Sequence, residues 1–272
     1  MKAKAKTAEL PPAMILCGGK GTRLRDVTEL LPKPLVPIGE YPIVWHVMKT
    51  YAAFGVKRFI LCLGYKREEF VDYFLNYRSR VNDITVHLAE HGSVQIHADE
   101  QCEDWQVTLA NTGLDTMTGG RILRAAKYLQ SDDQDFFLTY GDGLADLDIA
   151  DELQFHRQKQ KLLTCAAVQP AARFGELYIE QDTVCSFNEK PAQTDGYING
   201  GFMILKREFL KKYLSTKKDQ FLEQEPIRKA VQERQMIAYR HEGFWQCMDN
   251  PREYQLLNEL WKKKQAPWTK FW

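Results

Sequence analysis

The stretch Leu16-Cys17-Gly18-Gly19-Lys20-Gly21-Thr22-Arg23-Leu24-Arg25, which begins at the end of a short apolar run, carries the strongest indication of fold in this chain. In a glycine-rich turn after a strand, backbone N–H groups can close on an anion, because no Cβ blocks the approach and glycine adopts positive φ without cost. The guanidinium of Arg23 and the ammonium of Lys33, in the following Pro32-Lys33-Pro34-Leu35, supply positive charge for the same oxygens. The pattern matches neither GxxxxGKS/T nor GxGxxG with a later acidic residue. It predicts a phosphate-binding loop of another kind.

This string and PKPL together resemble the signature of the sugar-1-phosphate nucleotidylyltransferases, enzymes that join a nucleoside triphosphate to a sugar phosphate. Later family motifs follow in order and at approximately the right spacing, as Tyr140-Gly141-Asp142-Gly143, Glu189-Lys190-Pro191, Asn199-Gly200-Gly201 and Trp245-Gln246-Cys247-Met248-Asp249. Within the family the chain is most similar to the glucose-1-phosphate cytidylyltransferases, through Trp45-His46, Thr118-Gly119-Gly120-Arg121, Arg173-Phe174-Gly175 and Ala266-Pro267-Trp268. The resemblance implies CTP and a hexose 1-phosphate as substrates, CDP-sugar and pyrophosphate as products, and Mg²⁺ as cofactor.

Charge and composition limit the other classes of function. The 272 residues include 37 basic and 36 acidic ones, so no broad field for nucleic acid or an anionic membrane is expected and any anion site must be local. No stretch approaches the roughly 20 apolar residues of a membrane helix, and the basic leader Met1–Lys6 has no apolar region behind it. Six scattered cysteines without CxxC pairs indicate reduced thiols in a cytoplasmic protein.

The first half of the chain alternates between strand and helix patterns. Apolar runs at 13–17 and 58–64 flank a stretch at 42–54 with helical spacing, which predicts a βαβ unit. A helix at 68–77, strands near 84–88 and 106–111, a helix at 120–129 and a buried strand at 136–140 follow. This order predicts a Rossmann-like, doubly wound and mostly parallel α/β sheet, whose ligands lie beyond the carboxyl ends of the strands.

The second half predicts a smaller, β-rich sugar-binding extension of the sheet. Short strands with turns between them, at 163–169, 175–180, 184–187 and 200–205, indicate an antiparallel or mixed arrangement, and a helix at 251–264 closes the chain. We expect one nucleotidyltransferase domain over residues 1–272, with a nucleotide-binding part at about 13–160 and a sugar-phosphate-binding part at about 161–272.

Two aspartates are the candidate magnesium ligands. Asp142 stands between glycines after a strand, and the family resemblance assigns Mg²⁺ to it and to Asp249. One or two carboxylates plus substrate phosphates are the usual surroundings of protein-bound Mg²⁺. For Asp142 alone, an ordinary turn aspartate is the alternative.

The resemblance assigns the remaining site residues by motif. It places Lys33 on the α-phosphate, Arg23 on the β- and γ-phosphates, Lys190 on the sugar phosphate and Glu189 on sugar hydroxyls, with Arg23, Lys33, Asp142 and Lys190 as the catalytic set. A solvated loop lysine at 33 and a surface ion pair at 190 are the alternatives. Asn199 and Gly200 are expected to contact the hexose, while the nucleotide is expected to contact Leu16, Gly18, Gly19, Gly21, Thr22, Arg23, Lys33, Thr118, Gly120 and Arg121.

Arg121 is the candidate reader of the base. A guanidinium can donate to O2 and N3 of cytosine, whereas uracil and thymine present an N3–H instead. A contact with phosphate or with a helix neighbour is the alternative for this residue. Glu176, where related cytidylyltransferases carry a smaller or apolar residue, leaves the identity of the sugar phosphate open.

Other functions remain to be weighed against this one. They are the same chemistry with UTP, dTTP or another phosphorylated substrate, a non-catalytic nucleotide-sugar sensor or scaffold, and a nicotinamide-dependent oxidoreductase. The joint presence of the cations and both acids disfavours a sensor, and PKPL without a ribose-binding acid disfavours the oxidoreductase. The resemblance also implies a homo-oligomer, for which the aromatic C-terminus (Trp261, Trp268, Phe271, Trp272) is a candidate subunit contact.

Overall fold

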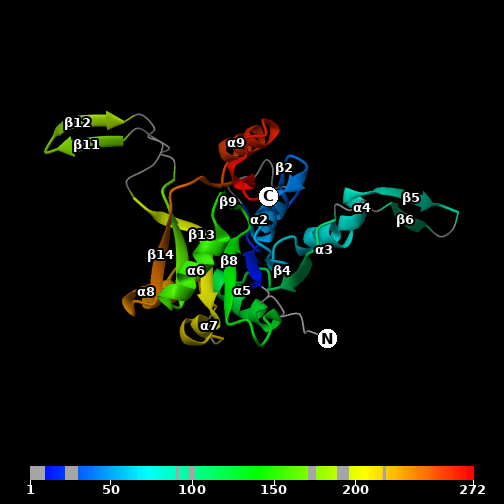
Figure 1. Cartoon of the computed structure of the whole chain (residues 1–272), viewed down its shortest axis with the longest axis horizontal. Coiled ribbons are helices and arrows are strands. Elements are labelled where there is room, and N and C mark those ends of the chain that lie inside the picture. Colours follow the sequence, from blue (N-terminus) through cyan, green and yellow to red (C-terminus); the bar gives the residue numbers. More distant parts are fainter. Residues whose placement is uncertain are drawn as a thin grey trace, which may run out of the picture.

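A seven-stranded sheet in the order β14-β10-β13-β8-β1-β4-β7 forms the centre of the molecule (Figure 1). The computed structural model describes residues 10–21, 30–89, 92–97, 102–170, 176–188, 196–216 and 219–272, with the backbone alone at 176–179 and 186–188. The strands of the sheet are β1 (Ala13–Leu16), β4 (Arg58–Leu63), β7 (Gln106–Asn111), β8 (Asp135–Tyr140), β10 (Leu163–Val168), β13 (Ile198–Lys206) and β14 (Met236–His241). Strand β13 pairs antiparallel with β8 and β10, and the other neighbouring pairs are parallel. The prediction of a mostly parallel, mixed α/β sheet is confirmed.

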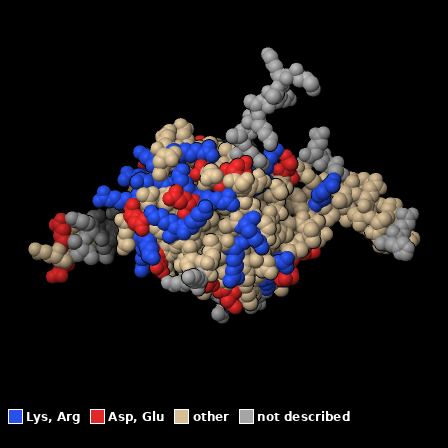
Figure 2. All heavy atoms as spheres, turned by 90° about the horizontal axis from the view of Figure 1, so that it is seen from below, with Lys and Arg blue, Asp and Glu red and all other residues tan. Residues whose placement is uncertain are grey.

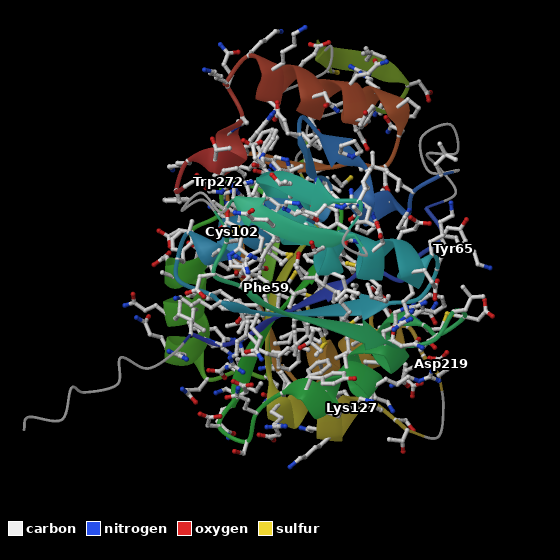
Figure 3. All side chains as sticks on the ribbon, turned by 90° about the vertical axis from the view of Figure 1, so that its right-hand side faces the viewer. Phe59, Tyr65, Cys102, Lys127, Asp219 and Trp272 are labelled. Atoms are coloured by element: carbon white, nitrogen blue, oxygen red, sulfur yellow. The ribbon has the colours of Figure 1, made fainter. Side chains whose placement is uncertain are left out.

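Both faces of the sheet are covered by helices. In β1, Ala13 and Ile15 belong to the core on one face and Met14 and Leu16 to the core on the other, because successive strand residues point to opposite sides. Helices α2 (Ile43–Ala52), α3 (Arg67–Leu75), α6 (Ile149–Lys159) and α9 (Pro251–Lys262) contribute to the first core, and α5 (Thr118–Ala125), α7 (Arg207–Tyr213) and α8 (Glu225–Gln232) to the second. Figure 3 shows the two sides, with Trp272 on the first and Lys127 on the second.

The expected βαβ unit is present at the start of the chain. Pro42 is the N-cap of α2, and the chain turns after the helix at Gly55, whose φ is +99°. Strands β1 and β4 then pair in parallel. The helix expected at 120–129 is shorter, because α5 passes into the 3₁₀ helix η3 (Ala126–Tyr128).

Two hairpins project from opposite ends of the molecule (Figure 1). One consists of β5 (Asp83–His87) and β6 (Ser93–His97), which follow the short helix α4 (Tyr77–Val81), and the other of β11 (Glu176–Glu180) and β12 (Thr183–Asn188). The strand expected near residues 84–88 therefore lies in a hairpin of its own. Of the strands expected in the mixed extension, β10 and β13 join the same sheet as β1, whereas β11 and β12 pair only with each other. Strand β14, which the sequence analysis did not predict, adds to the sheet beside β10. The division into two functional parts stays a prediction.

The aromatic C-terminus packs on its own chain. Trp268, in the 3₁₀ helix η4 (Pro267–Thr269), is buried, and the rings of Trp261 and Trp272 lie 4.7 Å and 5.7 Å from the imidazole of His46 on α2. Trp268 is thus unavailable for the subunit contact that the sequence suggested. Among the described helices, no helix has the length and apolar character that a membrane crossing requires.

Candidate active site

A cavity of about 480 Å³ opens at the carboxyl ends of the parallel strands, where the strand order predicts a ligand. Four segments form most of its walls: the glycine-rich loop after β1, the loop between β7 and α5, the end of β8, and the 3₁₀ helix η2 (Lys33–Leu35). The lining residues are Leu16 to Gly21, Lys33, Pro34, Leu114 to Thr118, Arg121, Tyr140 to Asp142, Phe221 and Asp249. The structure thereby brings together most of the predicted nucleotide-binding residues that it describes.

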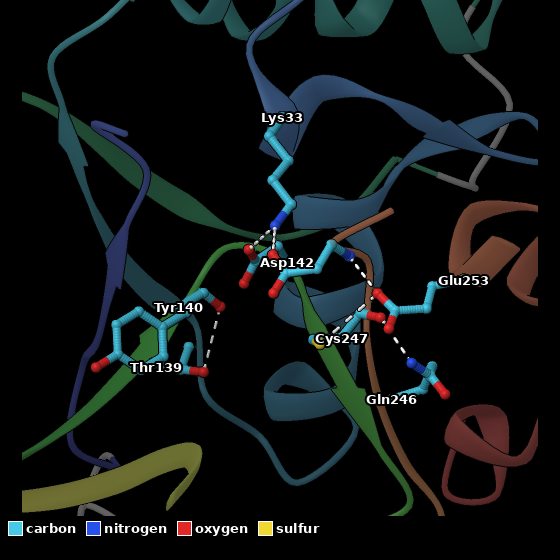
Figure 4. A network of polar contacts seen from close by, with 8 residues as sticks. Lys33, Thr139, Tyr140, Asp142, Gln246, Cys247 and Glu253 are labelled. Atoms are coloured by element: carbon cyan, nitrogen blue, oxygen red, sulfur yellow. Dashed lines mark hydrogen bonds and ion pairs between the residues drawn. The ribbon is translucent and has the colours of Figure 1, made fainter. Parts of the chain in front are cut away.

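Lys33 and the two candidate metal ligands meet on the floor of this cavity (Figure 4). The Nζ atom of Lys33 lies 2.6 Å from Oδ2 of Asp142 and also donates to Oδ1 of Asp249. Burial favours the neutral amine, but the two carboxylates outweigh it and raise the pKa of Lys33. Prolines on both sides leave the side chain as the mobile part of this segment.

Strand pairing explains how the two aspartates come together from distant parts of the sequence. Strands β9 (Gly143–Ala145) and β15 (Trp245–Cys247) pair antiparallel with Gly143 opposite Cys247, and the amide of Met248 donates to the carbonyl of Asp142 over 2.9 Å. The amide of Asp249 donates to Oε2 of Glu253 over 2.6 Å, in the first turn of α9. Both carboxylates therefore sit on backbone fixed by hydrogen bonds.

These carboxylates suit a hard cation. In the part of the chain that the structure describes, no cluster of three or more His, Cys, Asp or Glu side chains has the arrangement of a metal site. Two convergent carboxylates facing a cavity instead match the way Mg²⁺ is bound, with substrate phosphates and water as its other ligands. Lys33 already holds a positive charge between them, so their geometry suits a cation.

The three glycines of the loop have different surroundings. Gly21 has φ +60°, the conformation that the sequence leads one to expect in such a turn. A Cβ on Gly19 would meet nothing within 4 Å, whereas a Cβ on Gly18 would lie 2.2 Å from Cζ of Arg121. Gly18 is therefore glycine because a buried side chain fills the adjoining space.

The TGGR segment at 118–121 contributes unequally to the cavity. Thr118 lines it and donates to Oε2 of Glu223 over 2.6 Å. Gly120 is not among the lining residues and faces the side chain of Asp219. The Nη donors of Arg121 are occupied by backbone carbonyls and a hydroxyl. A guanidinium that reads a base through its Nη atoms would need these donors to be free.

A second cavity of about 190 Å³ adjoins the first. The two share Tyr140, Asp142 and Asp249, and the second is completed by Thr139, Gly143, Asn199 to Gly201, Trp245 and Cys247. The predicted hexose-contacting pair therefore borders a cavity beside the two candidate metal ligands. The reason for glycine at 200 is packing, however, since a Cβ there would lie 2.7 Å from Cγ1 of Val168.

Sequence reasoning omitted several lining residues and named others that lie outside the described part. Leu114 to Met117 follow the end of β7, so the rule that ligands lie beyond parallel strands could have found them. Phe221 lies in a turn before α8 and gives no such signal. Thr22, Arg23, Glu189 and Lys190 lie outside the described residues, as does Arg173-Phe174-Gly175.

Comparisons with known proteins agree on the family. The sequence profile of the nucleotidyl transferase family matches residues 12–259. The glucose-1-phosphate cytidylyltransferase of Salmonella typhi is 45% identical over 256 residues, which cover 94% of this chain and 98% of that protein. A probable glucose-1-phosphate cytidylyltransferase of Bacillus subtilis (strain 168) is 40% identical over 260 residues, which cover 96% and 99%. The crystal structure of HddC from Yersinia pseudotuberculosis complexed with GMP-PN superposes with a TM-score of 0.65 at 25% identity, covering 93% of this chain and 100% of that one. This chain belongs to the nucleotidyl transferase family.

Proposed function

We propose that this chain transfers the cytidylyl group of CTP to glucose 1-phosphate, giving CDP-glucose and pyrophosphate. The observation that carries the proposal is the identity of 40% and 45%, over nearly the whole chain, with curated glucose-1-phosphate cytidylyltransferases. The geometry suits two substrates of unequal size, because a larger and a smaller cavity meet at Asp142 and Asp249.

In this reaction the protein aligns two substrates and neutralises charge. An oxygen of the sugar phosphate attacks the α-phosphorus of CTP, a new P–O bond forms, and the bond to the leaving pyrophosphate breaks. No protein nucleophile is needed, so catalysis rests on positioning and on charge placed where it develops. We assign CTP to the larger cavity with the glycine-rich loop, and the sugar phosphate to the smaller one beside Asn199.

The charged residues of the floor divide this work. Asp142 and Asp249 would hold Mg²⁺, which neutralises charge on phosphate oxygens when it is bound. Lys33, buried beside both acids, is proposed to contact the α-phosphate as the substrates come together. The roles of Arg23 on the outer phosphates, Lys190 on the sugar phosphate and Glu189 on the hydroxyls are proposed from the family resemblance.

Pyrophosphate release with a panel of substrates tests this function. CTP with glucose 1-phosphate should be the preferred pair, ahead of UTP, dTTP and other sugar phosphates. Faster release with UTP or dTTP would contradict the choice of base, and faster release with another phosphorylated substrate the choice of sugar. A chain that binds nucleotide but releases no pyrophosphate with any pair would be a sensor or scaffold.

A further inference from the structure

Arg121 lies behind the glycine-rich loop with only 6% of its surface exposed. Its Nη2 atom donates to the carbonyl of Gly18 over 3.1 Å and to that of Leu114 over 2.9 Å. Its Nη1 atom donates to the carbonyl of Gly113 over 2.7 Å, and to the hydroxyl of Thr112 over 2.9 Å. A further contact of Nη1 reaches the carbonyl of Leu63 at 3.2 Å.

These acceptors lie at or just beyond the carboxyl ends of three neighbouring strands of the sheet. Gly18 follows β1, Leu63 ends β4, and Thr112 to Leu114 follow β7. One guanidinium thus joins the carboxyl ends of three parallel strands and fixes the loop of one against the loop of another. Each Nη atom carries two protons, so the four Nη protons are shared among five acceptors, and the Nε proton is the one N–H of the guanidinium that these contacts do not use.

Two glycines leave the space that the guanidinium of Arg121 fills. A Cβ on Gly18 would lie 2.2 Å from Cζ of Arg121, and a Cβ on Gly64 would lie 2.4 Å from its Nη1. A long side chain can usually move aside, but this one would have to break several buried hydrogen bonds to do so. The sequence therefore couples the choice of glycine at 18 to the choice of arginine at 121.

We propose that Arg121 is a positioning residue that holds the glycine-rich loop against the loop between β7 and α5, so that groups of these two loops, and not its guanidinium, select the nucleotide. The inference rests on the proposed function for the identity of the ligand. Ordering both loops before binding removes an entropic cost that every nucleotide would otherwise meet, whatever its base. If Arg121 instead contacted cytosine directly, its loss would weaken the binding of CTP alone.

Calorimetric titration of CTP and UTP against the full chain separates these two roles. Arg121→Ala should lower the affinity for CTP and for UTP by a similar factor, on the order of tenfold to a hundredfold. The ratio of the two dissociation constants should stay unchanged. In turnover assays the loss should fall on KM for CTP, with KM for glucose 1-phosphate unchanged. A loss of affinity for CTP alone, which would bring the dissociation constants of CTP and UTP closer together, would overturn the proposal.

A double-mutant cycle tests the contact with Gly18 directly. Gly18→Ala should weaken nucleotide binding strongly in the natural background and several-fold less in the Arg121→Ala background, where the space is free. Gly19→Ala is the matched control, because a Cβ there meets nothing within 4 Å, so its effect should be the same in both backgrounds. Additive effects of Gly18→Ala and Arg121→Ala would refute the coupling.

Arg121→Lys covers the case in which the alanine variant does not fold. A lysine offers three protons on one atom and cannot span the same carbonyls, so both nucleotides should lose part of their affinity in equal proportion. Selective loss of CTP in this variant would again overturn the proposal. If the natural chain prefers another nucleotide, the proposed function fails, and the same cycle with that nucleotide still tests the positioning role.

Discussion

The ammonium group of Lys33 lies between the carboxylates of Asp142 and Asp249 on the floor of the site and forms an ion pair with each. A divalent cation that binds these carboxylates must compete with that ammonium. We therefore expect Lys33→Ala to bind Mn²⁺ several-fold more tightly than the natural chain when nucleotide is absent, while turnover falls. Electron paramagnetic resonance titration of free Mn²⁺ measures this affinity. Weaker or equal Mn²⁺ binding by the variant would contradict the shared site.

Asp142 is expected to matter more for turnover than for nucleotide binding. Asp142→Asn keeps the shape of the side chain and removes its charge, so we expect turnover at saturating Mg²⁺ to fall on the order of a hundredfold or more. The dissociation constant for CTP should change much less. Asp132→Asn, at an exposed turn, is the control. Turnover near the natural value in Asp142→Asn would exclude this residue as a metal ligand.

The hairpin β5–β6 has one apolar and one polar face. Ile84 pairs with Ile96 and Val86 with Val94, whereas the alternate positions are polar, and Val94 is 54% exposed. Figure 2 shows that this projecting end carries few charged side chains. A two-stranded hairpin is marginally stable in water without a surface to pack on. If copies of this chain associate, as the family resemblance implies, this apolar face is a better candidate for their contact than the aromatic C-terminus, in which Trp268 is buried.

A charge on that face should separate the copies. We expect Val94→Glu to lower the mass measured by analytical ultracentrifugation, because a contact that buries this face would have to bury an unpaired carboxylate. Gln95→Glu places the same charge on the polar face of the same strand and should leave the mass unchanged. A monomeric natural chain, or equal masses for both variants, would exclude this hairpin as the contact.

A neutral histidine, His46, joins α2 to the C-terminal segment. Nε2 of His46 lies 2.9 Å from the carbonyl of Ile38 and must carry the proton, and Trp268 donates to Nδ1 over 3.3 Å. Burial lowers the pKa of His46 from 6.5 to about 4. The unfolded chain then binds the proton more readily than the folded one. Stability conferred by this group is complete above pH 6.5 and is lost as the pH falls towards 4.

The expected loss of unfolding free energy from His46 is about 3 kcal/mol across that window. Urea denaturation at several pH values measures it. His46→Gln keeps a donor for Ile38 but does not titrate, so its stability should depend less on pH between 4 and 6.5. Identical pH dependence of the two chains would contradict a neutral His46.

Glu152 on α6 should act in the opposite direction. Its two carboxylate oxygens are buried, have no hydrogen-bond partner among the described residues, and burial raises the pKa of Glu152 to about 8. The folded chain holds this proton more tightly than the unfolded one, so stability falls as the pH rises from 4.5 to 8. We expect Glu152→Gln to gain stability over the natural chain at pH 9, in thermal unfolding, and to gain less at pH 5. Glu259→Gln, at an exposed i,i+4 pair, should show no such difference.

Local patterns predicted the fold better than the site. The apolar run at β1, the helical spacing before β4 and the glycine after the helix are signals within one stretch of sequence, and they gave the parallel half of the sheet. The addition of β14 beside β10, or the projection of β5–β6 away from the sheet, depends on contacts between distant segments. Periodicity carries no information about such contacts.

The site shows the same division. Motifs named Lys33, Asp142 and Asp249, but their meeting depends on the pairing of β9 with β15, which no local pattern indicates. The partners of Arg121 are mostly backbone carbonyls, and every residue type carries one. The sequence could therefore suggest a hydrogen-bond donor at position 121, but it could not identify the carbonyl groups that accept those hydrogen bonds.

The distribution of tryptophans gives this chain two optical probes. Trp45, Trp105, Trp261, Trp268 and Trp272 lie in or beside the cluster around His46, and none of the five lines either cavity of the site. Trp245 lines the smaller cavity and donates to the carbonyl of Gly200 over 2.7 Å. Emission from the cluster should report acidification, since an imidazolium quenches neighbouring indoles. Emission from Trp245 should report a sugar phosphate entering its cavity. A single Trp245→Phe substitution would then separate the two signals without any added dye.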